Sequence, residues 1–146
     1  MTVARELAEF LVRTSPSDIP QQPLDHAAML IASTLASAAL GTGLQSSRII
    51  RDLARERGGR PDASLWFCSG PKLPMAEAAQ VNAVASDAAA SDDSDLRNIV
   101  HAGTTLAATG LAVAERTGAG GEEVLDRKST RLNSSHRSLS RMPSSA

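Results

Sequence analysis

The 146-residue sequence contains very few aromatic residues and a single cysteine. One tryptophan, two phenylalanines and no tyrosine make up 2% of the chain, whereas alanine is abundant. This composition favours closely packed helices over a β-sandwich, because alanine has the highest helix propensity and strands are enriched in aromatic and β-branched residues. The lone Cys68 excludes an intramolecular disulfide and suits a reducing compartment.

The sequence also lacks a recognisable signal peptide and an apolar run of membrane-spanning length. Residues Met1–Val12 mix charges of both signs with apolar positions, whereas a signal peptide joins a basic start to a continuous apolar stretch. The longest apolar run, Ala27–Leu40, is shorter than the roughly 20 residues that a span requires. We therefore expect a cytoplasmic protein that does not associate with membranes.

Charge is distributed unevenly along the chain. Asp126–Ala146 contains five basic residues and one acidic residue, so the overall charge of −1 leaves −5 for Met1–Leu125. A body of that sign has no electrostatic reason to bind nucleic acid. We expect no nucleic-acid partner.

The last 21 residues, DRKSTRLNSSHRSLSRMPSSA, differ in character from the rest. Seven are serine, and the segment is too polar to offset the entropy of ordering it, which predicts disorder. DRKSTRLNSSH and SRMPSSA also resemble, in one frame, the forward translation of a common sequencing adapter on either side of its index. We interpret 126–146 as a disordered, non-native tail and 1–125 as the protein itself.

Hydrophobic periodicity predicts a mainly α-helical bundle with at most one or two short strands. Within it, Ala63–Ser69 is the one plausible strand, and Glu122–Leu125 resembles a helix that is cut off after its first turn. The helices are expected from Thr2, with Thr2 as the cap; from Pro23 to Leu40, ended by Gly41; from Ser46 or Ser47 to Gly58; from Pro74 to Ala90; and from Thr104 to Gly118.

No motif for a metal or nucleotide is visible in residues 1–125. His26 and His101 show no metal-ligand spacing, and Gly41-Thr42-Gly43 is better explained as a helix-ending turn than as a phosphate loop. Cys68 has no base nearby in sequence. We expect no metal and no cofactor.

One polar segment between two predicted helices has chemical potential. Asp92-Asp93-Ser94-Asp95 is followed, after a short spacer, by His101-Ala102-Gly103-Thr104-Thr105. One interpretation is a solvated linker whose Asp and Thr residues cap helices. The other is a site in which His101 is a general acid/base, because histidine exchanges protons near neutral pH, and amides near Thr104 and Thr105 hold a substrate carboxylate.

The order of these features resembles the MmgE/PrpD family, which includes 2-methylcitrate dehydratase and cis-aconitate decarboxylase. VNAVASDAAASDDSD is similar to the family's Ala-rich helix ending in a D-x-D-D-T-type motif. HAGTTLAATGLAVAERTGAGG is similar to its His-Pro-Gly element and the A-E-x-x-G-x-x-G helix that follows. The resemblance covers essentially all of Met1–Leu125.

The resemblance implies a fragment of a cofactor-independent lyase that removes a proton next to a carboxylate of a small polycarboxylate, and a homodimeric full-length form. By position, it matches His101 to the family's active-site histidine, Asp92 and Asp93 to its paired acids, and Ser94 to a residue that is often Thr. The chemistry of the residues then predicts His101 and Asp93 as catalytic, with Asp93 orienting His101 or raising its pKa by proximity. The predicted substrate-binding residues are Ser94, Asp92, Thr104 and Thr105. Two departures, Ala90 for the first Asp of the motif and Ala102 for the Pro, put the identity of the substrate in doubt.

Two alternatives stay open at this stage. An isomerase or epimerase of a dicarboxylate would use the same histidine without elimination. A small non-enzymatic helical interaction module would use the basic tail as an arm. If the chain is the amino-terminal part of an enzyme, we expect it to be inactive and poorly soluble alone, because a helical face meant for missing partners would be exposed.

Overall fold

The computed structural model describes residues 2–94, 100–121 and 124. The expected tail at 126–146 and most of the helix opening at 122–125 lie outside them. The described residues form five α-helices and one 3₁₀ turn and no strand, which confirms the mainly α prediction. The elements are α1 (Val3–Arg13), η1 (Pro16–Asp18), α2 (Gln21–Gly41), α3 (Gln45–Arg57), α4 (Met75–Ala88) and α5 (Ala102–Thr117).

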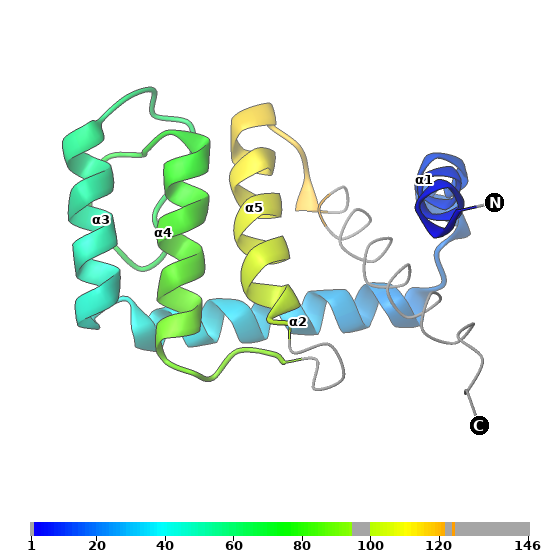
Figure 1. Ribbon diagram of the computed structural model, residues 1–146, viewed down its shortest axis with the longest axis horizontal. Coiled ribbons are helices and arrows are strands. Elements are labelled where there is room, and N and C mark those ends of the chain that lie inside the picture. Colours follow the sequence, from blue (N-terminus) through cyan, green and yellow to red (C-terminus); the bar gives the residue numbers. More distant parts are fainter. Residues whose placement is uncertain (1, 95–99, 122–123, 125–146) are drawn as a thin grey trace.

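Helix α4 is the centre of the fold. Helices α3, α4 and α5 stand side by side, and the long α2 crosses one end of this row (Figure 1). Helix α4 packs against all three of the others. The crossing with α2 is close, because a Cβ atom at Gly41 would overlap the carbonyl oxygen of Ala85. The absence of a side chain at Gly41 therefore allows α2 to approach α4 this closely.

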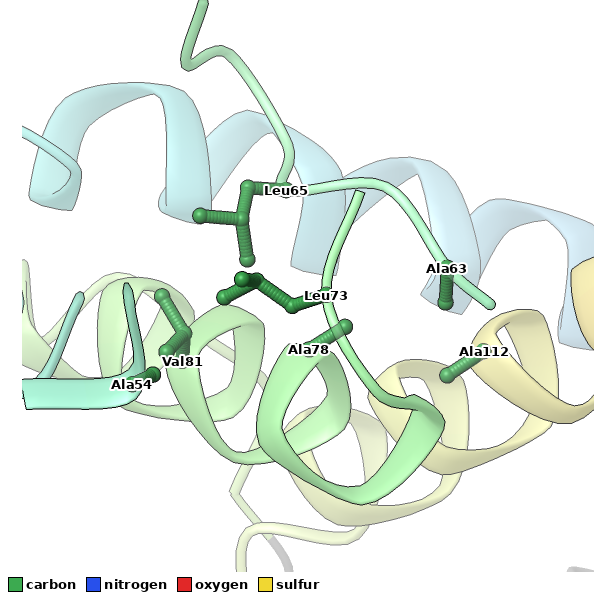
Figure 2. Packing of buried hydrophobic residues seen from close by; sticks show 7 residues of the cluster. All are labelled: Ala54, Ala63, Leu65, Leu73, Ala78, Val81 and Ala112. Atoms are coloured by element: carbon green, nitrogen blue, oxygen red, sulfur yellow. The ribbon is translucent and has the colours of Figure 1, made fainter. Parts of the chain in front are cut away.

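The apolar core is built mainly from small side chains. Leu65 and Leu73, from the segment between α3 and α4, point toward one another above Val81 of α4 (Figure 2). The cluster comprises Ala54, Ala63, Leu65, Leu73, Ala78, Val81 and Ala112. Because alanine side chains are short, the helix backbones can approach closely, and each core substitution that adds volume should be poorly tolerated.

The predicted strand at Ala63–Ser69 was wrong. Ala63 forms only an isolated antiparallel bridge with Leu73. After this bridge, helix side chains form hydrogen bonds with the backbone of the segment. Asn82 accepts one from the Trp66 amide at 2.9 Å and donates one to the Ser64 carbonyl at 3.0 Å. The Ser64 amide donates to Glu115 of α5. Once these groups are satisfied by helix side chains, no partner strand is required.

Of the two predicted caps, Thr2 was placed correctly, whereas the serine cap of α3 was wrong. Thr2 occupies the N-cap position of α1, but its side chain makes no capping hydrogen bond. Helix α3 begins at Gln45 after Leu44, earlier than either predicted serine. Ser47 is instead buried inside that helix, and its hydroxyl has no hydrogen-bond partner among the residues that the structure describes.

Helix α2 is long and apolar enough to cross a membrane, judged by length and composition alone. The sequence prediction considered only its shorter apolar run. Core helices of soluble proteins satisfy the same criterion. The buried residues of α2, which include Thr34, Ser37 and Gly41, lie where it packs on α4 and α5.

Candidate functional site

The polar segment singled out in the sequence lies where α4 ends and α5 begins, at the end of the row crossed by α2 (Figure 1). Helix α4 ends at Ala88, and the chain turns at Ala90, whose φ of 49° is left-handed. That conformation is unfavourable for alanine. His101 then occupies the N-cap position of α5. Ala102 is the first residue of this helix, where proline is well tolerated, so its departure from the family motif leaves the helix start intact.

His101 is paired with Asp92. The Nδ1 atom of His101 lies 2.7 Å from Oδ2 of Asp92. The Asp92 side chain is 2% exposed, whereas that of His101 is 47% exposed. The histidine therefore reaches solvent while a nearly buried carboxylate holds one of its ring nitrogens. With Nδ1 engaged, Nε2 is the nitrogen left to exchange a proton with a ligand.

Three carboxylates raise the pKa of His101 above its ordinary value of 6.5. The hydrogen bond to Asp92 is the main cause, followed by the charge of the same group. Asp87, whose Oδ1 lies 3.9 Å from His101 Nδ1, and Asp93 add smaller charge effects, and partial burial opposes them. These carboxylates therefore stabilise the protonated imidazolium relative to the neutral ring.

Asp93 was predicted to orient His101 or to raise its pKa by proximity, and its hydrogen bond goes to another residue. Its Oδ2 accepts a hydrogen bond from the Gly103 amide at 3.1 Å, and thus caps α5 from outside the helix. The direct partner of His101 is Asp92. Asp93 therefore adds to the raised pKa of His101 through its charge and does not orient the ring.

The predicted substrate-binding residues are only partly available. Ser94 is exposed, with its Oγ 3.5 Å from His101 Nδ1. Thr105 is also exposed, and its amide and hydroxyl both lie 3.4 Å from the His101 carbonyl oxygen. Thr104 is only 7% exposed, and its hydroxyl donates to Asp92 Oδ2 at 2.8 Å. The structure therefore brings His101 and Ser94 together at the surface and places the Asp92 carboxylate and Thr104 beneath them.

The residues around His101, here called the His101 cluster, are Asp92, Ser94, Thr104 and two residues that the sequence analysis missed. Asp87 and Ser86 come from the last turn of α4, and Ser86 Oγ lies 3.2 Å from Thr104 Oγ1. Their proximity to the acidic segment along the chain was the one available signal. Periodicity gave no indication, because it places a residue on a helix face without saying which loop folds back onto that face.

The described residues contain one group whose geometry could hold a cation. Asp87, Asp92 and His101 each offer one ligand atom, and these atoms lie within 4.8 Å of one another. Sequence spacing did not predict this group. Asp92 Oδ2 already accepts hydrogen bonds from Thr104 and His101. The pairing of Asp92 with His101 therefore explains why these three side chains lie together without a cation.

The comparisons with known proteins agree with the resemblance found in the sequence. The sequence profile of the MmgE/PrpD N-terminal domain matches residues 5–128. No curated protein and no solved structure matches the chain. The matched region includes every described helix apart from the first residues of α1, and it contains the whole His101 cluster. The chain therefore belongs to the MmgE/PrpD family and carries its N-terminal domain.

Proposed function

We propose that this domain belongs to a cofactor-independent lyase that acts on a small polycarboxylate, by dehydration or decarboxylation. Family membership and one geometric observation support the proposal: a half-exposed histidine, held by a nearly buried carboxylate, at the start of a helix. This arrangement suits proton transfer, because Asp92 fixes one ring nitrogen and leaves the other for the substrate. The non-enzymatic interaction module has no comparable support.

In this proposal His101 moves the proton. Its carboxylate neighbours raise its pKa, which strengthens its hold on a proton taken from the substrate. In a dehydration, Nε2 of His101 takes the proton from the carbon next to a carboxylate, the electrons of that C–H bond form the double bond, and the C–O bond breaks. The resulting imidazolium gives the proton to the departing hydroxyl, which leaves as water, and its charge attracts the substrate's carboxylate groups. The exposed Ser94 hydroxyl, 3.5 Å from His101 Nδ1, is the group proposed to bind a substrate carboxylate.

We further propose that the active form is a longer, cytoplasmic and homodimeric protein in which this domain is joined to the rest of the family's fold. The matched family description is that of an N-terminal domain. The genomic reading frame around codon 125 tests this proposal. A frame that continues into family sequence in place of the serine-rich tail would support it, and a stop codon after a genuine tail would contradict it.

The function is tested on the protein encoded by that complete reading frame. It is incubated with 2-methylcitrate, cis-aconitate or amino-dicarboxylates, and products are followed by NMR. Loss of water or carbon dioxide supports the lyase. Inversion at carbon without loss of a group supports the isomerase or epimerase alternative, and no turnover of any polycarboxylate contradicts both.

A further inference from the structure

A line of hydrogen-bonding groups connects the helical core to His101. Ser37 of α2 donates to the backbone carbonyl of Ser86 at 2.6 Å. The Ser86 hydroxyl lies 3.2 Å from Thr104 Oγ1, which in turn donates to Asp92 Oδ2 at 2.8 Å. Asp92 holds His101. Ser37 and Ser86 are at most 1% exposed and Thr104 is 7% exposed, so the line lies inside a core otherwise made largely of alanine.

The hydroxyl of Thr104 behaves differently from other helical threonines in this chain. Thr34 donates to the carbonyl of Leu30 and Thr117 to that of Val113, each within its own helix. This is the ordinary solution for a threonine in a helix, because the carbonyl one turn earlier is nearby. Thr104 lies in the first turn of α5, and it donates to a carboxylate from another segment. Its bond therefore fixes tertiary structure.

We propose that Thr104, backed by Ser86, is a positioning residue that holds Asp92 in the orientation required to orient His101. The Asp92 side chain is 2% exposed, and both donors reach the same oxygen, Oδ2. If the Thr104 donor is lost, the carboxylate is under-satisfied where it lies and turns toward water. This role goes beyond the substrate contact predicted from the sequence, since the Thr104 hydroxyl is committed to Asp92.

The inference rests on the proposed function for its kinetic consequences only. In the complete enzyme, Thr104→Val removes the hydroxyl at nearly constant volume. Because His101 loses its fixed orientation, we expect kcat to fall by roughly 10–100-fold while KM changes little. Thr104→Ser keeps a hydroxyl and should retain most of the kcat. Thr117→Val, the same substitution at the far end of α5, is the matched control and should leave kcat unchanged.

A second measurement does not depend on activity. The protein is labelled at histidine Cε1, the His101 signal is assigned by its loss in His101→Gln, and its pKa is determined by NMR titration. We expect the pKa of His101 to fall toward 6.5 in Thr104→Val and to stay at the wild-type value in Thr104→Ser and Thr117→Val. Ser86→Ala, a milder change, should shift it in the same direction by a smaller amount.

These measurements distinguish a failure of the proposed lyase function from a failure of the positioning role of Thr104. A wild-type enzyme that turns over no polycarboxylate sinks the proposed function, yet the titration still decides the role of Thr104. A rise in KM alone in Thr104→Val would make Thr104 a substrate contact and overturn the inference. An unchanged pKa of His101 in both Thr104→Val and Ser86→Ala would also overturn it, because a purely structural threonine affects stability without affecting the histidine.

Discussion

Gly103 and Asp93 pack so closely that any side chain at position 103 would force its neighbours to shift. A Cβ atom on Gly103 would overlap Asp93 Oδ1 and lie 2.7 Å from Thr34 Oγ1. The same carboxylate accepts the Gly103 amide hydrogen bond. The glycine of the His-x-Gly element thus allows an acid from the preceding loop to approach the start of α5, and so helps to determine where that loop lies.

Gly103→Ala should therefore destabilise the protein, although alanine is the better helix former. The added methyl group forces Asp93 or the backbone to move, at a cost of about 1–3 kcal/mol. Gly110→Ala on the same helix is the control. Its Cβ would meet only Val124 at an ordinary 3.8 Å, so helix propensity should make it stabilising by up to about 1 kcal/mol. Urea unfolding measures both, and equal effects of the two substitutions would contradict the packing argument.

His101→Gln should lower turnover of the complete enzyme by roughly 100-fold or more, because it removes the group that transfers a proton. His26→Gln is the control. His26 is exposed on α2, outside the cluster, and its replacement should leave turnover unchanged. Steady-state kinetics at a fixed pH measure the difference. Turnover close to wild type in His101→Gln would exclude the histidine from the mechanism.

The titration of His101 should link stability to pH with a defined sign. The pKa of His101 is raised in the folded protein, so the folded state binds the proton more tightly than the unfolded chain. The resulting stabilisation is fully present below the unfolded value near 6.5 and is lost as pH rises through the folded pKa. Unfolding free energies of wild type and His101→Gln, compared across this range, measure the contribution.

Asp92→Asn identifies the source of the shift. It removes both the charge and the strongest acceptor, and should bring the pKa of His101 toward 6.5. Asp87→Asn is the control, because Asp87 is 61% exposed and lies 3.9 Å away, and it should change the pKa less. A larger effect from Asp87→Asn would show that Asp92 is not the main partner.

Asn82→Ala should destabilise the protein by roughly 2–4 kcal/mol, because two backbone groups of the segment between α3 and α4 lose their partner. Asn82 is 2% exposed. Gln80→Ala, on the exposed side of the same helix, should change stability by less than about 0.5 kcal/mol. Thermal and urea unfolding measure both. A loss below about 1 kcal/mol in Asn82→Ala would indicate that water replaces the amide.

The amino-acid sequence alone determined the helices, the alanine-rich packing and the position of His101 at a helix start. Each of these follows from interactions within about one helical turn, which periodicity, alanine content and glycine positions record directly. Boundaries agreed to within a few residues for α2 and α4, where a proline marks the start.

Tertiary structure decided the rest. It selected Asp92 over Asp93 as the partner of His101, buried Thr104, brought in Asp87, and replaced the expected strand with contacts to Asn82 and Glu115. Neighbouring acids have the same local chemistry, so their roles depend on how the loop packs against α5. That packing is set by close approaches such as the one at Gly103, which no local pattern encodes.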